Sequence, residues 1–191
     1  MELTMLQKEN PFGGFDPELL ACAARNAGHL LVAEHFDGGG YSLIWRDQVS
    51  GKFAAFAQPF HREGASEYVA FAGYLAEALV SHGSFVHACK TYEASEGAEL
   101  DAVKAKMVAN ILRGSWERFE QYTNEALQQW NDSKRRPLSH FMLSKLDSIP
   151  EKPLEHHRAA YKKGSSTAAS LVQCGGSEFH IPNSALVEEA K

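Results

Sequence analysis

The stretch 99–133 constrains the fold more than any other part of the chain, because its apolar residues recur every three or four positions. Acidic residues precede the stretch, a basic run at 134–136 follows it, and Pro137 then interrupts any helix. The pattern therefore predicts one helix of roughly 35 residues, about 52 Å long at ~1.5 Å per residue. Gly114 is its weakest position, since glycine costs about 1 kcal/mol relative to alanine inside a helix. A helix of this length either spans a domain as its packing spine or pairs with a second chain.

Length and composition are those of an ordinary globular protein, with 191 residues of which 44% are hydrophobic and 23% charged. No apolar run reaches the ~18 residues that a membrane-spanning helix needs, and residues 1–10 lack the features of a secretory signal. The three cysteines, Cys22, Cys89 and Cys174, are an odd number without a close pair, which favours reduced thiols. We therefore expect a cytoplasmic protein that has no contact with a membrane.

The formal charge of -5 is unevenly distributed along the chain. Residues 1–133 hold 10 basic and 18 acidic side chains, a net charge of -8, whereas residues 134–163 hold 8 and 3, a net charge of +5. Residues 164–191 hold 1 and 3 and are rich in Ser and Gly at their start. We therefore divide the chain into an α+β domain (1–133), a basic helical appendage (134–163) and a linker with a tail (164–191).

Local signals before the long helix predict an α+β domain, in which a small antiparallel β-meander of about four strands packs against helices. Asp16 is a good N-cap and Pro17 suits the first helical position, so a first helix is predicted over 17–27 and Gly28 ends it. Strands are predicted over 29–36, 41–46, 52–58 and 85–92, and the glycines between the first two indicate a hairpin. The strand 52–58 is apolar on both faces, which predicts a central strand or one covered on both sides.

Further helices are predicted from spacing and punctuation. One spans 66–82 and ends at Gly83, and two short ones, at 138–149 and 154–163, follow the long helix. The first of the short helices carries an apolar stripe made of Leu138, Phe141, Met142, Leu146 and Ile149. Residues 165–177 are rich in Ser, Ala and Gly, which predicts a linker or mobile loop.

His87 and Cys89 are the strongest catalytic candidates, because alternation along the predicted strand would place both side chains on one face. There they could ligate a metal or form a thiolate–imidazole pair. His61 lies in a polar turn beside Glu63 and could take part in acid–base chemistry. Structural roles are nevertheless favoured for these residues, since free cysteine is commonly buried and polar turns are commonly solvated. Because no third ligand is identified, neither a metal nor a cofactor is predicted.

Two sets of residues are candidates for binding. The first consists of the aromatic residues of the long helix, which serve either as core or as interface anchors; they are Trp116, Phe119, Tyr122 and Trp130. The second is basic and could contact phosphates; it consists of Lys134, Arg135, Arg136 and Arg158. The sequence pI of about 6.0 and the absence of a reading motif disfavour nucleic acid as the partner.

The sequence contains no motif that names a reaction, which favours a non-enzymatic cytoplasmic interaction or regulatory protein. We expect it to bind a protein partner and to form a homo-oligomer, most simply a homodimer, through the long helix. One alternative is a small metal- or Cys/His-dependent hydrolase built around His87, Cys89 and His61. A second alternative is a nucleic-acid-binding accessory factor that uses residues 134–163.

Overall fold

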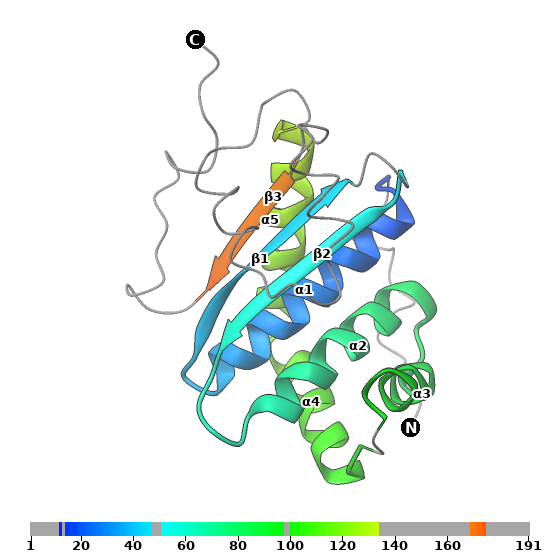
Figure 1. Ribbon diagram of the computed structural model, residues 1–191, viewed down its shortest axis with the longest axis vertical. Coiled ribbons are helices and arrows are strands. Elements are labelled where there is room, and N and C mark those ends of the chain that lie inside the picture. The colour runs from blue at the N-terminus through cyan, green and yellow to red at the C-terminus, as the bar shows by residue number, and fades with distance from the viewer. Residues whose placement is uncertain (1–11, 13, 47–50, 98–99, 134–168, 175–191) are drawn as a thin grey trace.

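The computed structural model describes residues 12, 14–46, 51–97, 100–133 and 169–174, in which five helices and a three-stranded sheet are present. The elements are α1 (Pro17–His35), β1 (Gly39–Arg46), β2 (Phe53–Phe60), α2 (Ser66–His82), α3 (Phe85–Glu96), α4 (Ala102–Gly114), α5 (Trp116–Ser133) and β3 (Ala169–Cys174). The sheet has the order β2-β1-β3 with antiparallel neighbours, and α1 and α5 lie against one face of it (Figure 1). The mixed helix-and-sheet class is thus confirmed, whereas a four-stranded meander is not.

Helix α1 begins as predicted but is eight residues longer than expected. The Asp16 carboxylate accepts hydrogen bonds from the amides of Glu18 and Leu19, at 2.9 and 3.4 Å, and Pro17 occupies the first turn. The helix then continues through Gly28 to His35, so the predicted strand over 29–36 is wrong. Gly28 does not end the helix but allows α2 to pack closely against it. A Cβ at position 28 would lie 2.5 Å from the carbonyl oxygen of Ala72 in α2.

Strands β1 and β2 confirm the predicted strands at 41–46 and 52–58, but they pair with each other and not with 29–36. Their hairpin register places Leu43 opposite Phe56 and Trp45 opposite Ala54. Strand β2 lies at an edge of the sheet and is half-buried, while β1 is central and is buried from Gly39 to Trp45. The central, buried strand is therefore β1 and not β2, the strand that was predicted to be central or covered on both sides.

Helix α2 spans 66–82 as predicted, and Gly83 ends it with the expected left-handed backbone at φ 61°. Residues 85–92, predicted as a strand, instead belong to α3. The Ser84 hydroxyl caps this helix by accepting a hydrogen bond from the His87 amide at 3.2 Å. Ala88 and Tyr92, one turn apart, are its buried residues, a spacing that suits a helix and is also compatible with strand alternation.

The long helix predicted over 99–133 is wrong, because the chain changes direction at Ser115, whose backbone has φ -120° and ψ 31°. The break directly follows Gly114, the position with the lowest helical propensity in the stretch. Helix α4 then packs on α2, while α5 packs on α1 and β3. The change of direction lets each half bury apolar residues against a different partner.

Strand β3 contradicts the predicted loop over 165–177, because residues 169–174 form an edge strand that pairs with β1. The predicted helices at 138–149 and 154–163 lie outside the described residues, as does the rest of the linker and tail. The proposed division of the chain at 134 and 164 is likewise left as a prediction.

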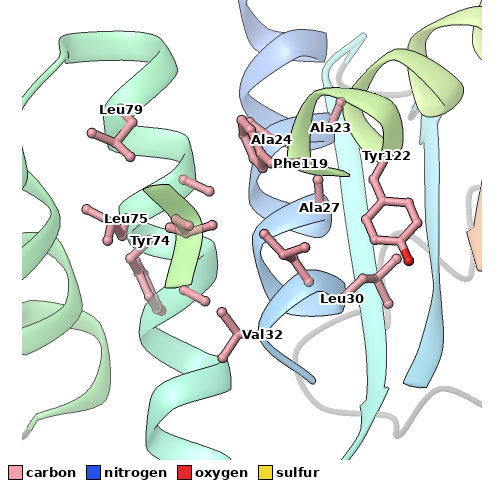
Figure 2. Close-up of a cluster of buried hydrophobic side chains, with 14 of the residues drawn as sticks. Ala23, Ala24, Ala27, Leu30, Val32, Tyr74, Leu75, Leu79, Phe119 and Tyr122 are labelled. Carbon is pink, nitrogen blue, oxygen red and sulfur yellow. The ribbon is translucent and has the colours of Figure 1, made fainter. Parts of the chain in front are cut away.

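The core lies between α1, α2 and α5. Figure 2 shows Ala24 and Ala27 of α1 beside Phe119 of α5, and Leu75 on the side of α2 away from α1. Each of these side chains is at most 2% exposed. The small side chains of Ala24 and Ala27 allow Phe119 to pack closely against α1 (Figure 2).

Candidate interaction surface

His87 and Cys89 are not a pair in the structure. They lie two residues apart on α3, which separates their side chains by about 200° around the helix axis. His87 is exposed and its ring centroid lies 4.1 Å from that of His82. Burial, and next the charge of Glu93, raises the pKa of the Cys89 thiol. The prediction that His87 and Cys89 share one face of a strand, on which a shared metal or a thiolate–imidazole pair depended, is thus wrong.

His61 lies in the turn between β2 and α2, where its Nδ1 is 3.1 Å from the carbonyl oxygen of Arg62. Arg62 itself pairs with Asp37 across the end of the hairpin, at 3.0 Å, and both side chains are largely exposed. Within the described part of the chain, no group of three or more His, Cys, Asp or Glu residues could hold a metal ion. The turn therefore presents a solvated ion pair beside the predicted histidine.

The aromatic binding candidates lie largely in the core of the chain itself. Phe119, Tyr122 and Trp130 are 0%, 2% and 5% exposed, and Trp116 is half-buried. Trp130 packs edge-on against Phe53 of β2, with ring centroids 5.0 Å apart. These side chains hold α5 to the domain, so they do not form an exposed surface for a second chain. The basic candidates lie outside the described residues; they are Lys134, Arg135, Arg136 and Arg158.

A polar cluster that sequence reasoning missed joins α1 to α5. The Tyr122 hydroxyl donates to Glu34 Oε2 at 2.7 Å, and Arg118 Nη2 lies 3.2 Å from Glu34 Oε1. The Arg118 guanidinium also lies over the Tyr122 ring, 4.6 Å from its centroid. The cluster could not be predicted, because Glu34 was placed on a strand and its partners are 84 and 88 residues away.

The thiols of Cys22 and Cys174 are poor nucleophiles. Burial, followed by the charge of Glu34, raises the pKa of Cys174 to about 12, and its thiol donates to the Leu30 carbonyl oxygen at 3.4 Å. Burial and then Glu77 raise the pKa of Cys22 to about 12. Both side chains are therefore protonated at neutral pH and act as small packing groups.

The exposed face of α4 combines apolar and basic side chains. Val103 is 76% exposed and Met107 38%, and they lie one helical turn apart. Ala105, Val108, Ile111 and Leu112 are the buried residues of this helix. The same helix has Lys104, Lys106 and Arg113 but no carboxylate in its sequence. Val103 and Met107 lie within the apolar pattern that predicts the long helix, so only the tertiary structure reveals their exposure.

Comparison of the chain with protein-family models, curated proteins and solved structures found no match in any of the three. None of the described helices is long and apolar enough to cross a membrane.

Proposed function

We propose that this chain is a non-enzymatic interaction or regulatory protein, and that the exposed face of α4 binds an acidic amphipathic segment of a protein partner. The observation that carries the proposal is the pair Val103 and Met107, exposed one turn apart and accompanied by exposed Lys106 and Arg113. An apolar stripe with basic neighbours complements a helix that has one apolar face and one acidic face.

Local charge supports an acidic partner. Residues 1–133 have a net charge of -8, yet α4 contributes three cations and no anion. Lys104 forms an ion pair with Glu67 of α2, which leaves Lys106 and Arg113 as the more accessible cations of this helix. Such a patch steers an acidic segment toward the apolar pair at low ionic strength.

Self-association remains a proposal that needs a different surface from the predicted one. The aromatic residues of α5 pack within the chain, and a symmetric α4–α4 contact would bring like charges of two copies together. Light scattering on the purified protein at low and high salt measures the oligomeric state directly. A cytoplasmic location is also part of the proposal, and the three free thiols support it.

The alternatives have less support. The hydrolase loses its central pair, because His87 and Cys89 point to different sides of α3. The nucleic-acid factor depends on residues 134–163, and the cations of α4 could also contact phosphates. Retention on heparin that falls steeply with salt would favour this alternative over a protein partner.

Fluorescence anisotropy tests the proposal with a labelled helical peptide that has leucine on one face and glutamate on the other. We expect the peptide to bind, and the double variant Val103→Glu and Met107→Glu to weaken binding by about tenfold or more, equivalent to ~1.4 kcal/mol. The matched control, Ala94→Glu and Gln128→Glu, adds the same charges at exposed sites of α3 and α5. Equal binding of a leucine–lysine peptide, or an equal loss in the control, would contradict the proposal.

A further inference from the structure

The sheet has a second apolar face, which we call the outer face; it comprises Tyr41, Leu43 and Trp45 of β1 with Phe56 of β2. Successive side chains of a strand point to opposite sides, so these three β1 residues share a face and Ile44 points the other way. The register places Phe56 directly opposite Leu43, and the rings of Tyr41 and Phe56 are 6.5 Å apart. The outer face is therefore a continuous apolar surface across two strands.

The inner face is the one that packs on the helices. Ile44 belongs to the hydrophobic core together with residues of α1 and α5, and Phe53 of β2 contacts Trp130 of α5. Tyr41, Leu43 and Trp45 are buried but do not belong to that core. In Figure 1, α1 and α5 both lie behind the sheet, and no described helix lies in front of it.

The outer face is nevertheless shielded from solvent. Leu43 is 1% exposed, Trp45 3% and Tyr41 7%, values that match the inner residue Ile44 at 1%. An antiparallel sheet with one free face would instead show buried and exposed residues in alternation. Because no described helix lies over this face (Figure 1), its low exposure points to an occupant outside the described elements.

We propose that the outer face is a docking surface for the segment 138–149 of the same chain. This segment has an apolar stripe made of Leu138, Phe141, Met142, Leu146 and Ile149. As a helix it would be about 18 Å long at ~1.5 Å per residue, shorter than the roughly 26 Å of an eight-residue strand. Its apolar stripe would contact Leu43 and Phe56, and its polar side would face water.

The position of the segment in the chain supports this assignment. It belongs to the connection 134–168, which begins where α5 ends and finishes where β3 begins. Helix α5 packs on β3, and β3 is itself an edge strand of the sheet. Both ends of the connection are therefore anchored beside the sheet, so docking on it requires no long excursion. The other candidate occupants are residues 1–11, residues 175–191 and a second copy of the chain.

Photo-crosslinking tests the proposal in the full-length protein with its fold undisturbed. A benzophenone amino acid replaces Phe141 on the apolar stripe, and in the control it replaces His140, which lies on the opposite side of the predicted helix. We expect position 141 to form crosslinks within one chain to Tyr41, Leu43, Trp45 or Phe56, and position 140 to form none there. Crosslinks from position 141 between two copies, or to other parts of the chain alone, would overturn the proposal.

Hydroxyl-radical labelling provides a second, independent readout. The variant Phe141→Asp and Leu146→Asp should raise labelling of Tyr41 and Trp45 several-fold and leave Phe71, a core residue of α2, unchanged. The variant His140→Asp and Ser144→Asp adds the same charges to the polar side and should change nothing. Persistent protection in the first variant would assign the cover to residues 1–11 or 175–191, and protection lost on dilution would assign it to a second copy; either result refutes the proposal.

Discussion

Helix α2 packs against α1 and α3 in opposite ways. Against α1 it presents small residues: Gly28 of α1 meets Ala72 and Ala76, and Gly73 of α2 meets the ring of His29. Against α3 it presents rings, as Phe71 lies 6.1 Å from Phe85 and 5.6 Å from Tyr92, centroid to centroid. We call these contacts the glycine seam and the aromatic seam.

The two seams differ in which change each tolerates. In the glycine seam an added methyl group at Gly28 meets main-chain atoms of Ala72, which cannot move aside. In the aromatic seam large rings fill the space between the helices, so a truncated ring leaves a cavity. Substitutions that enlarge a residue should therefore damage the first seam, and substitutions that shorten one should damage the second.

The largest effect is expected for Phe71→Ala in the aromatic seam. Phe71 is completely buried and contacts two rings of α3, so its truncation should lower the free energy of unfolding by about 3–5 kcal/mol. Urea denaturation followed by circular dichroism measures this change. Val103→Ala, at an exposed site of α4, should change stability by less than about 0.5 kcal/mol. Similar losses in both variants would contradict the contrast.

A somewhat smaller effect is expected for Gly28→Val in the glycine seam. A Cβ there would lie 2.5 Å from the Ala72 carbonyl oxygen and 2.7 Å from the Ala76 Cβ, so the helices must separate. We expect a loss of about 3 kcal/mol in the same denaturation experiment, near the upper end for overpacked sites. Gly114→Val is the control, because no atom lies within 4 Å of a Cβ at that position. An unchanged free energy of unfolding in Gly28→Val would contradict the close approach of α1 and α2 at this position.

The glycine seam should also make stability depend on pH through His29. Its Nδ1 donates to the Val69 carbonyl oxygen at 2.8 Å, and burial lowers its pKa from 6.5 to about 4. The Val69 hydrogen bond and Glu96 oppose this shift, and Arg25 adds to it. The unfolded chain therefore takes up a proton near pH 6.5 that the folded chain refuses until about pH 4.

Because the unfolded state binds the extra proton, this contribution to stability is fully present above pH 6.5 and is lost as the pH falls toward 4. Between about pH 7.5 and pH 5 the loss should be about 2 kcal/mol. Denaturation curves at several pH values measure it. His29→Gln should flatten this part of the pH profile, and His82→Gln, at the exposed end of α2, should not. An unchanged profile in His29→Gln would assign the pH dependence to other groups.

The smallest effect concerns the boundary between α4 and α5. Gly114→Ala removes the residue with the lowest helical propensity and meets no neighbouring atom, so it should stabilise the protein by less than about 1 kcal/mol. We expect the break at Ser115 to persist, because α4 packs on α2 and α5 on α1. Backbone chemical shifts of Ser115 report its conformation. A continuous helix in the variant would show that Gly114 alone causes the break.

Residues with strong local signals were predictable from sequence. Asp16 and Pro17 mark the start of α1, Gly83 marks the end of α2, and the β1 and β2 strands follow from apolar and β-branched or aromatic composition. In each case the physical cause is a cap, a turn conformation or a side-chain preference within a few residues.

Tertiary contacts decided the rest. Helix α1 passes through Gly28 because α2 approaches it there, and β3 forms because β1 offers it an edge more than 120 residues away in the chain. The same holds for the candidate surface: Val103 belongs to the apolar pattern of the predicted long helix, and in the structure it is exposed on α4. Periodicity records which residues are apolar, but which of them are buried depends on where the chain turns and what it then meets.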